Sequence, residues 1–125
     1  TTLANGDGTY AVSITPPTAA QVITVYLNTG GGANGAMVTK YNSGDISDAD
    51  IYQDYLIVRD EQVAPDINNY DLDTANDGDT DLTAMYADEA GATDTLTVAA
   101  GKELLVWTGD TYTPEDTVTA DKQKG

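Results

Sequence analysis

The sequence predicts an all-β protein, either an antiparallel β-sandwich or a barrel, folded as a single domain over residues 1–125. Short runs of β-branched and aromatic residues recur along the chain, and clusters of Gly, Pro, Asn and Asp separate them, as in sandwiches and barrels. Hydrophobic residues make up 40% of the 125 residues, which suits one domain with a modest core. No internal repeat and no linker interrupts this pattern.

The first third of the chain contains three candidate strands. In residues 9–14 (TYAVSI), Tyr10, Val12 and Ile14 alternate with small or polar residues, which predicts a strand with one buried face. A turn-forming NGDG sequence precedes this strand, and a double proline ends it. The other two candidates are residues 22–28 (VITVYLN) and residues 37–41 (MVTKY).

The middle of the chain is where one short helix is expected. Ser47 is a candidate N-cap, and Asp50 follows three residues later, which resembles a capping box. This arrangement predicts a helix near residues 47–53 that leads into a strand at residues 55–60 (YLIVRD). The apolar positions of the same stretch also fit a longer helical face, so the choice between strand and helix stays open there.

The second half begins with a polar segment and ends in strands. Residues 66–81 are rich in Asp and are expected to form a loop, and a short apolar piece follows at residues 82–87. The last third, TLTVAAGKELLVWTGDTYTPEDTVTA, alternates strand-forming runs with Gly turns. It predicts strands at residues 96–98, 103–107 and 117–120.

Acidic residues dominate the charge of the chain. The sequence has 21 Asp and Glu against 5 Lys and Arg, for a net charge of −16. Nucleic acid and anionic membrane are therefore poor partners, because binding a phosphate backbone requires basic residues. Self-repulsion of this size destabilises a small folded body, so bound cations or concentrated salt are expected to offset it. The composition is typical of proteins from salt-loving organisms or their viruses.

The residue types that most enzymes use are missing. The chain has no His and no Cys, which excludes imidazole acid–base chemistry, Ser-His-Asp and Cys-His mechanisms, and the common zinc sites. Two carboxylates can together hydrolyse a glycoside, but none of these many acids is set apart by apolar neighbours in the sequence. We expect that the protein is not an enzyme and requires no cofactor.

The densest acidic stretch, YDLDTANDGDTD at residues 70–81, is a candidate calcium loop. When Asp73 is taken as the first position of a twelve-residue loop, Gly78 occupies the sixth position, where the chain must turn sharply. Ala75 and Ala84 stand where two further ligands belong, so a hydrated acidic loop is the alternative. The candidate calcium ligands are Asp73, Asp77, Asp79 and Asp81.

Two further features could contact partners. Tyr10, Tyr26 and Trp107 are candidates for a platform on which sugar rings stack, or else for packing in the core. The C-terminal sequence DKQKG carries Lys122 and Lys124, which either dock on an acidic partner or lie in solvent at a frayed chain end.

Several stretches resemble known families. DGTYAVSITPPTAA (residues 7–20) is similar to the DGxYxVxxxP strand of filamin-like and bacterial Ig-like domains, where that strand lies late in the fold. TTLANGDGTYAVSI, VITVYLNTGGGANGAMVTKY and AGKELLVWTGD resemble segments of small β-rich virion proteins of tailed viruses, either phages or haloarchaeal viruses. Proteins of that kind decorate heads or connect tails.

The resemblance to virion proteins implies a structural function. It implies a head-decoration protein that binds capsid protein through a β-sandwich surface, forms a homo-oligomer, and exposes an acidic face at the virion surface. The residues leave a second function open, which is an extracellular module, stabilised by calcium, that binds carbohydrate or a cell surface. Neither function involves nucleic acid or a membrane.

Overall fold

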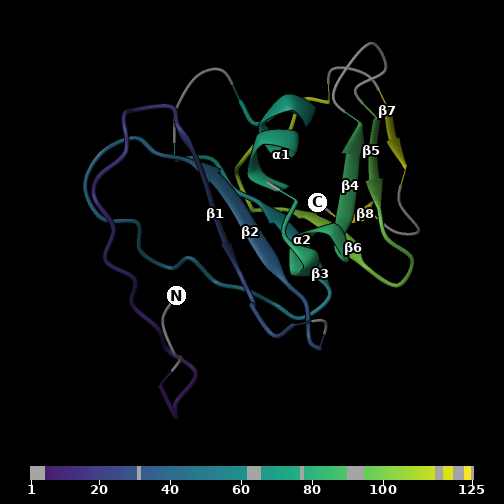
Figure 1. Cartoon of the computed structure of the whole chain (residues 1–125). Helices are drawn as coiled ribbons and strands as arrows, with labels where there is room; N and C mark the ends of the chain where they lie inside the picture. Colours follow the sequence, from purple (N-terminus) through teal and green to yellow (C-terminus); the bar gives the residue numbers. More distant parts are fainter. Residues whose placement is uncertain are drawn as a thin grey trace.

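The computed structural model describes residues 5–30, 32–61, 66–76, 78–89, 95–114, 117–119 and 123–124. Two short helices and a series of short strands make up its regular structure (Figure 1). None of the described helices is long and apolar enough to cross a bilayer. The elements are β1 (Val22–Tyr26), β2 (Ala36–Lys40), β3 (Tyr55–Val58), α1 (Asn69–Asn76), α2 (Thr80–Thr83), β4 (Tyr86–Glu89), β5 (Thr95–Val98), β6 (Glu103–Val106), β7 (Thr117–Thr119) and β8 (Gln123–Lys124).

The strands form two open sheets with mixed directions. The larger sheet has the order β1-β2-β3-β6-β8, and the smaller has the order β4-β5-β7. The prediction of a strand-rich fold is confirmed, but purely antiparallel pairing is wrong, because only β1–β2 and β4–β5 are antiparallel among the described pairs. Parallel neighbours need long crossover connections, and the crossover from β3 to β6 carries α1, α2, β4 and β5. Among the described strands neither sheet closes on itself, so the barrel alternative is also wrong.

One hydrophobic core joins both sheets and both helices. The strand register places Ala36, Val38, Leu56, Val58 and Leu104 on one face of the larger sheet, here called the core face. These side chains are buried against residues of α1, α2 and the smaller sheet, and α1 contacts both β1 and β4 (Figure 1). The other members of this core are Ile67, Leu72, Ala75, Leu82, Met85, Tyr86, Leu96 and Val98.

The opposite face of the larger sheet, here called the outer face, is also covered at its centre. Met37 and Ile57 point to this face and are as buried as the core residues. Continuous apolar runs of this kind are typical of parallel strands that are buried on both faces. Residues 45–54 cross this face closely, since a Cβ atom at Gly35 would lie 2.4 Å from the carbonyl oxygen of Tyr52.

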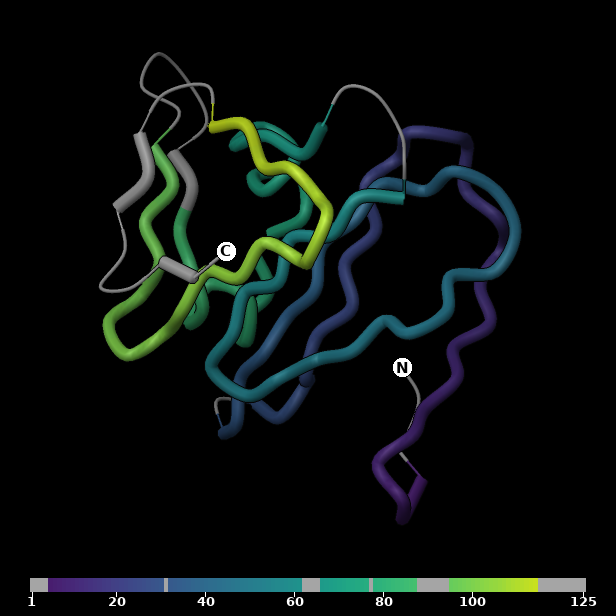
Figure 2. Tube along the Cα trace, turned by 180° about the vertical axis from the view of Figure 1, so that it is seen from behind, coloured from purple at the N-terminus to yellow at the C-terminus, as the bar shows by residue number. Residues whose placement is uncertain are grey.

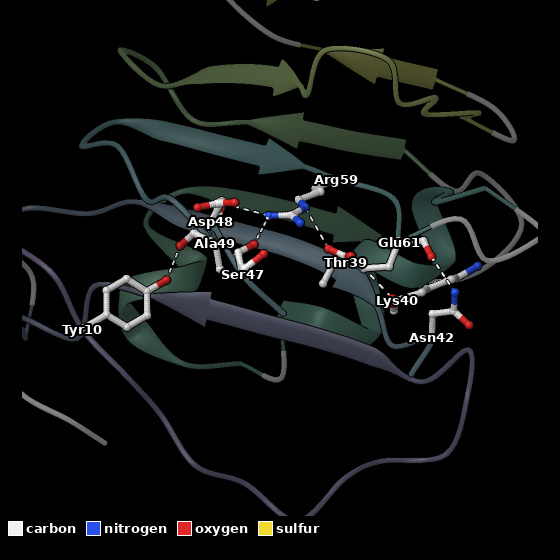
Figure 3. A network of polar contacts seen from close by, with 9 residues as sticks. All are labelled: Tyr10, Thr39, Lys40, Asn42, Ser47, Asp48, Ala49, Arg59 and Glu61. Atoms are coloured by element: carbon white, nitrogen blue, oxygen red, sulfur yellow. Dashed lines mark hydrogen bonds and ion pairs between the residues drawn. The ribbon is translucent and has the colours of Figure 1, made fainter. Parts of the chain in front are cut away.

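The helix predicted near residues 47–53 is wrong. Asp48 and Asp54 have φ angles of 55° and 68°, in the left-handed region that a right-handed helix cannot contain. The Nη1 atom of Arg59 donates to the carbonyl oxygens of Ser47 and Asp48, both at 2.7 Å (Figure 3). A helix would use these carbonyls for its own hydrogen bonds, so the contact with Arg59 replaces helical structure here.

Three other parts of the chain differ from the prediction. Residues 9–14 have no strand partner among the described residues. The acidic stretch expected to be a loop instead contains α1 and α2. At the C-terminus, the backbone of Gln123–Lys124 forms β8 and pairs with β6, so a frayed end is wrong for these two residues, while Lys122 lies outside the described residues.

Candidate functional site

The acidic segment folds because its polar side chains cap its helices. The side chain of Asn68 accepts a hydrogen bond from the backbone N–H of Asp71, and the side chain of Asp71 accepts one from the N–H of Asn68, both at 3.0 Å. This reciprocal pair is a capping box at the start of α1. Leu72 and Ala75 then lie on the buried side of the helix. The pattern of Asn followed three residues later by Asp is the signal in the sequence that sequence reasoning missed.

Asp71 also forms a buried ion pair with β2. Its Oδ2 atom lies 2.8 Å from the Nζ atom of Lys40, and the two side chains are 11% and 5% exposed. Lys40 additionally donates to the carbonyl oxygen of Asp66 at 3.4 Å. The pair therefore links α1 to the core face of the sheet. A lone Lys at the end of an apolar strand, in AMVTK, was the only trace of it in the sequence.

Asp81, a candidate calcium ligand, anchors the loop between β1 and β2. Its Oδ2 atom accepts hydrogen bonds from the backbone N–H groups of Thr29 at 3.0 Å and Gly30 at 3.1 Å. Its Oδ1 atom accepts from the side-chain amide of Asn34 at 3.2 Å. Asp81 is 3% exposed, so both carboxylate oxygens are occupied by donors of the chain itself.

The remaining calcium candidates are spread over different environments. Asp79 is the N-cap of α2, where its Oδ1 atom accepts from the N–H of Asp81 at 2.9 Å, and its Oδ2 atom accepts from the hydroxyl of Tyr26 at 2.9 Å. Asp73 lies on α1 and is partly exposed, and Asp77 is outside the described residues. Within the described ranges no three acidic side chains gather closely enough to hold a metal ion. Calcium binding stays a prediction.

A polar cavity lies where this segment meets β1. It has a volume of about 450 Å³ and is partly open to solvent. The hydroxyl of Thr24 donates to the carbonyl oxygen of Ala75 at 3.1 Å at its wall, and Asp79 is the one acid among the described lining residues. That carboxylate already accepts hydrogen bonds from Tyr26 and Asp81. The lining residues are Thr24, Tyr26, Thr74, Ala75, Gly78, Asp79 and Leu82.

An aromatic cluster stands on the outer face of the larger sheet. Tyr52 stacks on Trp107 with ring centroids 6.4 Å apart and planes at 18°, and meets Tyr55 edge-on at 6.3 Å. Tyr52 is 45% exposed, and the negative charge of Asp50, followed by burial, raises the pKa of its phenol. The ion pair between Lys102 and Asp54, at 2.5 Å, links the residues that precede β6 and β3.

The aromatic residues proposed from sequence do not form one platform. Trp107 belongs to the aromatic cluster just described. Tyr10 instead donates its hydroxyl hydrogen to the carbonyl oxygen of Ala49, and Tyr26 donates to Asp79 beside the cavity. The ring neighbour of Trp107 is Tyr52, which in turn meets Tyr55 edge-on; sequence reasoning assigned these two tyrosines to a helix and a strand. Their spacing of three residues gave no signal of a shared surface.

Residues 5–20, here called the N-terminal arm, form an extended segment with little contact to the body. Figure 2 shows the arm in purple along one side of the molecule, with its tip beyond the rest of the chain. Val12 and Ile14 are 49% and 59% exposed. All residues of the arm are exposed except Tyr10 and Pro17, which are half-buried. The arm therefore presents apolar side chains to solvent.

Charge divides the chain into two parts. Residues 8–39 contain no Asp, Glu, Lys or Arg, and they include nearly all of the arm together with β1 and most of β2. All 21 acidic residues lie outside this range, although Asp79 reaches it through its hydrogen bond with Tyr26.

Comparisons with family models, with curated proteins and with solved structures found no match to this chain.

Proposed function

We propose that this protein is a structural protein of a virion, with decoration of the head shell of a tailed virus as its role. The observation that supports the proposal is the division of charge between residues 8–39 and the rest of the chain. An uncharged surface can approach another protein without desolvating charges or meeting like charges. The acidic remainder then faces solvent and keeps decorated particles apart by repulsion.

The contact with capsid protein involves the uncharged part of the chain. Its arm carries exposed Val12 and Ile14, and exposed apolar residues on a soluble protein commonly mark an interaction surface. The two sheets act as a rigid β-sandwich that holds this surface in place. A contact role also suits a chain without His or Cys, because binding requires shape and apolar area rather than a reactive side chain.

Binding of the purified protein to undecorated capsids tests the proposal. We expect saturable binding at a fixed stoichiometry, strengthened by KCl because salt screens the repulsion between acidic proteins. The double variant Val12→Asp/Ile14→Asp should bind poorly. A matched double variant that adds the same charge elsewhere, Tyr70→Asp/Thr74→Asp on exposed positions of α1, should bind normally. Absence of binding at every salt concentration would overturn the proposal.

The aromatic cluster supports a second candidate function, an extracellular module that binds carbohydrate and is stabilised by calcium. An exposed tyrosine stacked on a tryptophan offers an apolar face to a sugar ring. Because Trp107 is the only tryptophan, its fluorescence reports binding directly. A saturable change on titration with oligosaccharides, lost in Tyr52→Ala but kept in Tyr70→Ala, would favour this function over decoration.

Calcium is tested separately from sugar. If Asp73, Asp77, Asp79 and Asp81 bind calcium, millimolar CaCl₂ should raise the melting temperature far more than KCl of equal ionic strength, and a chelator should reverse the effect. An equal response to the two salts would show that screening alone stabilises the acidic body. Asp73→Asn is the most informative variant. The fold described above does not depend on a hydrogen bond of the Asp73 carboxylate, so a change in the response to calcium would reflect the loss of a ligand.

A further inference from the structure

The N-terminal arm has the sequence of a strand without a strand partner among the described residues. Tyr10, Val12 and Ile14 alternate with small or polar residues, which is the pattern of a strand with one buried face. Val12 and Ile14 nevertheless face solvent at 49% and 59% exposure. Of these three residues, Tyr10 is the one that contacts the body, through the hydrogen bond from its hydroxyl to the carbonyl oxygen of Ala49 (Figure 3). The pattern therefore predicts a neighbouring strand, which the described part of one copy of the chain does not supply.

The connection between arm and sheet explains why the arm does not pair within its own chain. Pro16 and Pro17 lack backbone N–H groups and cannot continue a hydrogen-bonded ladder. Ala20 then adopts a φ of 69°, and its N–H donates to the carbonyl oxygen of Tyr41 at 2.7 Å. The chain thus turns sharply before it enters β1, and the arm leads away from the sheet (Figure 2).

The larger sheet offers an edge that matches the arm. β1 is the terminal strand of the larger sheet among the described strands. Hydrogen bonds between Gln21 and Tyr41 and between Leu27 and Gly35 show that odd-numbered residues of this strand pair with β2. Because antiparallel pairing alternates, the backbone groups of Val22 and Thr24 point toward the open edge. The five residues of β1 also match the length of residues 9–14.

Charge limits where two copies of this chain can meet. Two bodies that each carry a net charge of −16 repel one another over most of their surfaces. Residues 9–14 of the arm and β1 both lie within residues 8–39, which carry no charge. Contact between the arm of one copy and β1 of another therefore joins the two segments that bring the fewest like charges together.

We propose that two copies of this chain exchange their arms, so that residues 9–14 of each copy add a strand to the β1 edge of the other. Such an exchange is reciprocal and satisfies a twofold axis. It pairs the outward-facing backbone groups of Val22 and Thr24, and it places Val12 and Ile14 together on one face of the extended sheet. The proposed function expects the protein to form a homo-oligomer, and this inference, which partly rests on that function, names the segments through which two copies meet. Its test uses the purified protein without any capsid.

Analytical ultracentrifugation across a range of protein and KCl concentrations is the first measurement. We expect a monomer–dimer equilibrium that shifts toward the dimer as KCl approaches about 1 M, where the Debye length falls to about 3 Å. Val12→Asp/Ile14→Asp should weaken dimerisation at least about tenfold, while the matched variant Tyr70→Asp/Thr74→Asp should not. The arm residues are exposed, so far-ultraviolet circular dichroism should show that the monomer fold is unchanged.

Site-directed crosslinking then identifies which segments meet. The chain has no native Cys, so Ser13→Cys and Ile23→Cys can be made as separate single variants and mixed. A short bismaleimide should link the two variants to each other, and it should not link Ser13→Cys to Tyr70→Cys. Three results would overturn the proposal: a monomer at every salt concentration, a dimer that is indifferent to the arm variants, or no crosslink between the mixed Ser13→Cys and Ile23→Cys variants under conditions in which the dimer forms. Failure of capsid binding with arm exchange intact would overturn only the virion function.

Discussion

The two faces of the larger sheet are both covered at the centre, but the covering parts differ in kind. On the core face, Ala36, Val38, Leu56 and Val58 pack against side chains from two helices and a second sheet. On the outer face, Met37 and Ile57 are equally buried beneath residues 45–54, which contain neither helix nor strand.

The attachments on the two faces differ as well. Buried charged groups tie elements together on the core face, namely the Lys40–Asp71 ion pair and the Asp81 carboxylate. On the outer face the segment is held through its backbone, because the N–H of Asp54 donates to the carbonyl oxygen of Asn34 at 2.7 Å and the partly exposed guanidinium of Arg59 donates to the carbonyl oxygens of Ser47 and Asp48. Since an unpaired buried charge is far more costly than a lost hydrogen bond of a partly exposed group, damage to the core face should destabilise the whole fold, and damage to the outer face should act locally.

Removal of the Lys40 ammonium should have the largest effect. Lys40→Met leaves the Asp71 carboxylate buried without its cation, which should lower the free energy of unfolding by about 3–5 kcal/mol. Urea unfolding measures the loss. The double variant Lys40→Met/Asp71→Asn keeps an acceptor for the helix cap and removes the charge, so it should recover most of the stability. Equal stability of the single and double variants would contradict the role of the pair.

Removal of the Asp81 carboxylate should have the next largest effect. Asp81→Ala leaves the N–H groups of Thr29 and Gly30 without their acceptor and removes one of the two acceptors of the Asn34 amide, which keeps the carbonyl oxygen of residue 81, at a cost of about 3 kcal/mol. Asp81→Asn should cost less, because its amide oxygen still accepts. Hydrogen exchange should show the loss at residues 29 and 30 before other parts of the sheet; uniform exchange across the chain would argue against a local anchor.

A small change on the outer face tests the other side of the comparison. Gly35→Ala places a Cβ atom 2.4 Å from the carbonyl oxygen of Tyr52, which should displace residues 45–54 at a cost of about 1–3 kcal/mol. Faster hydrogen exchange at Asp54 with little change in the core strands is the expected signature. Gly6→Ala, where no atom lies within 4 Å, serves as the control and should change stability by less than about 0.5 kcal/mol.

Ionisation of Tyr10 should have the smallest effect. Burial, and secondly the charge of Asp50, raise the pKa of its phenol. The folded protein therefore favours the neutral phenol of Tyr10. The stability that this neutral phenol contributes is fully present below the ordinary pKa of about 10 and is lost as the pH rises through the raised pKa. Absorbance titration of the protein against Tyr10→Phe should assign a late-ionising phenol to this residue. Cleavage of the arm by a protease should increase in Tyr10→Phe at neutral pH; an unchanged rate would show that Tyr10 does not hold the arm.

Most strand positions could be predicted from sequence, whereas strand directions could not. The runs VITVY, AMVTK, YLIV, TLTV and ELLV form strands where β-branched and aromatic residues predict them. Direction depends on how the crossovers travel, and the long segment between β3 and β6 gives no local sign of its path. Two similar cap patterns had opposite outcomes. Asn68 and Asp71 start a helix, because Leu72 and Ala75 can be buried behind them. Ser47 starts no helix, because Arg59 donates hydrogen bonds to the carbonyl oxygens of Ser47 and Asp48.

By itself the sequence determined the strand-rich composition, the absence of His and Cys, and the separation of an uncharged stretch from an acidic remainder. Tertiary structure alone decided the role of each carboxylate. Asp81 is a buried anchor because folding brings it to the N–H groups of Thr29 and Gly30, about fifty residues away in the chain. Tertiary structure likewise left the strand pattern of residues 9–14 without a partner strand in the described part of its own chain. The physical reason is that hydrogen bonds and burial depend on neighbours in space, which residue type and spacing do not specify.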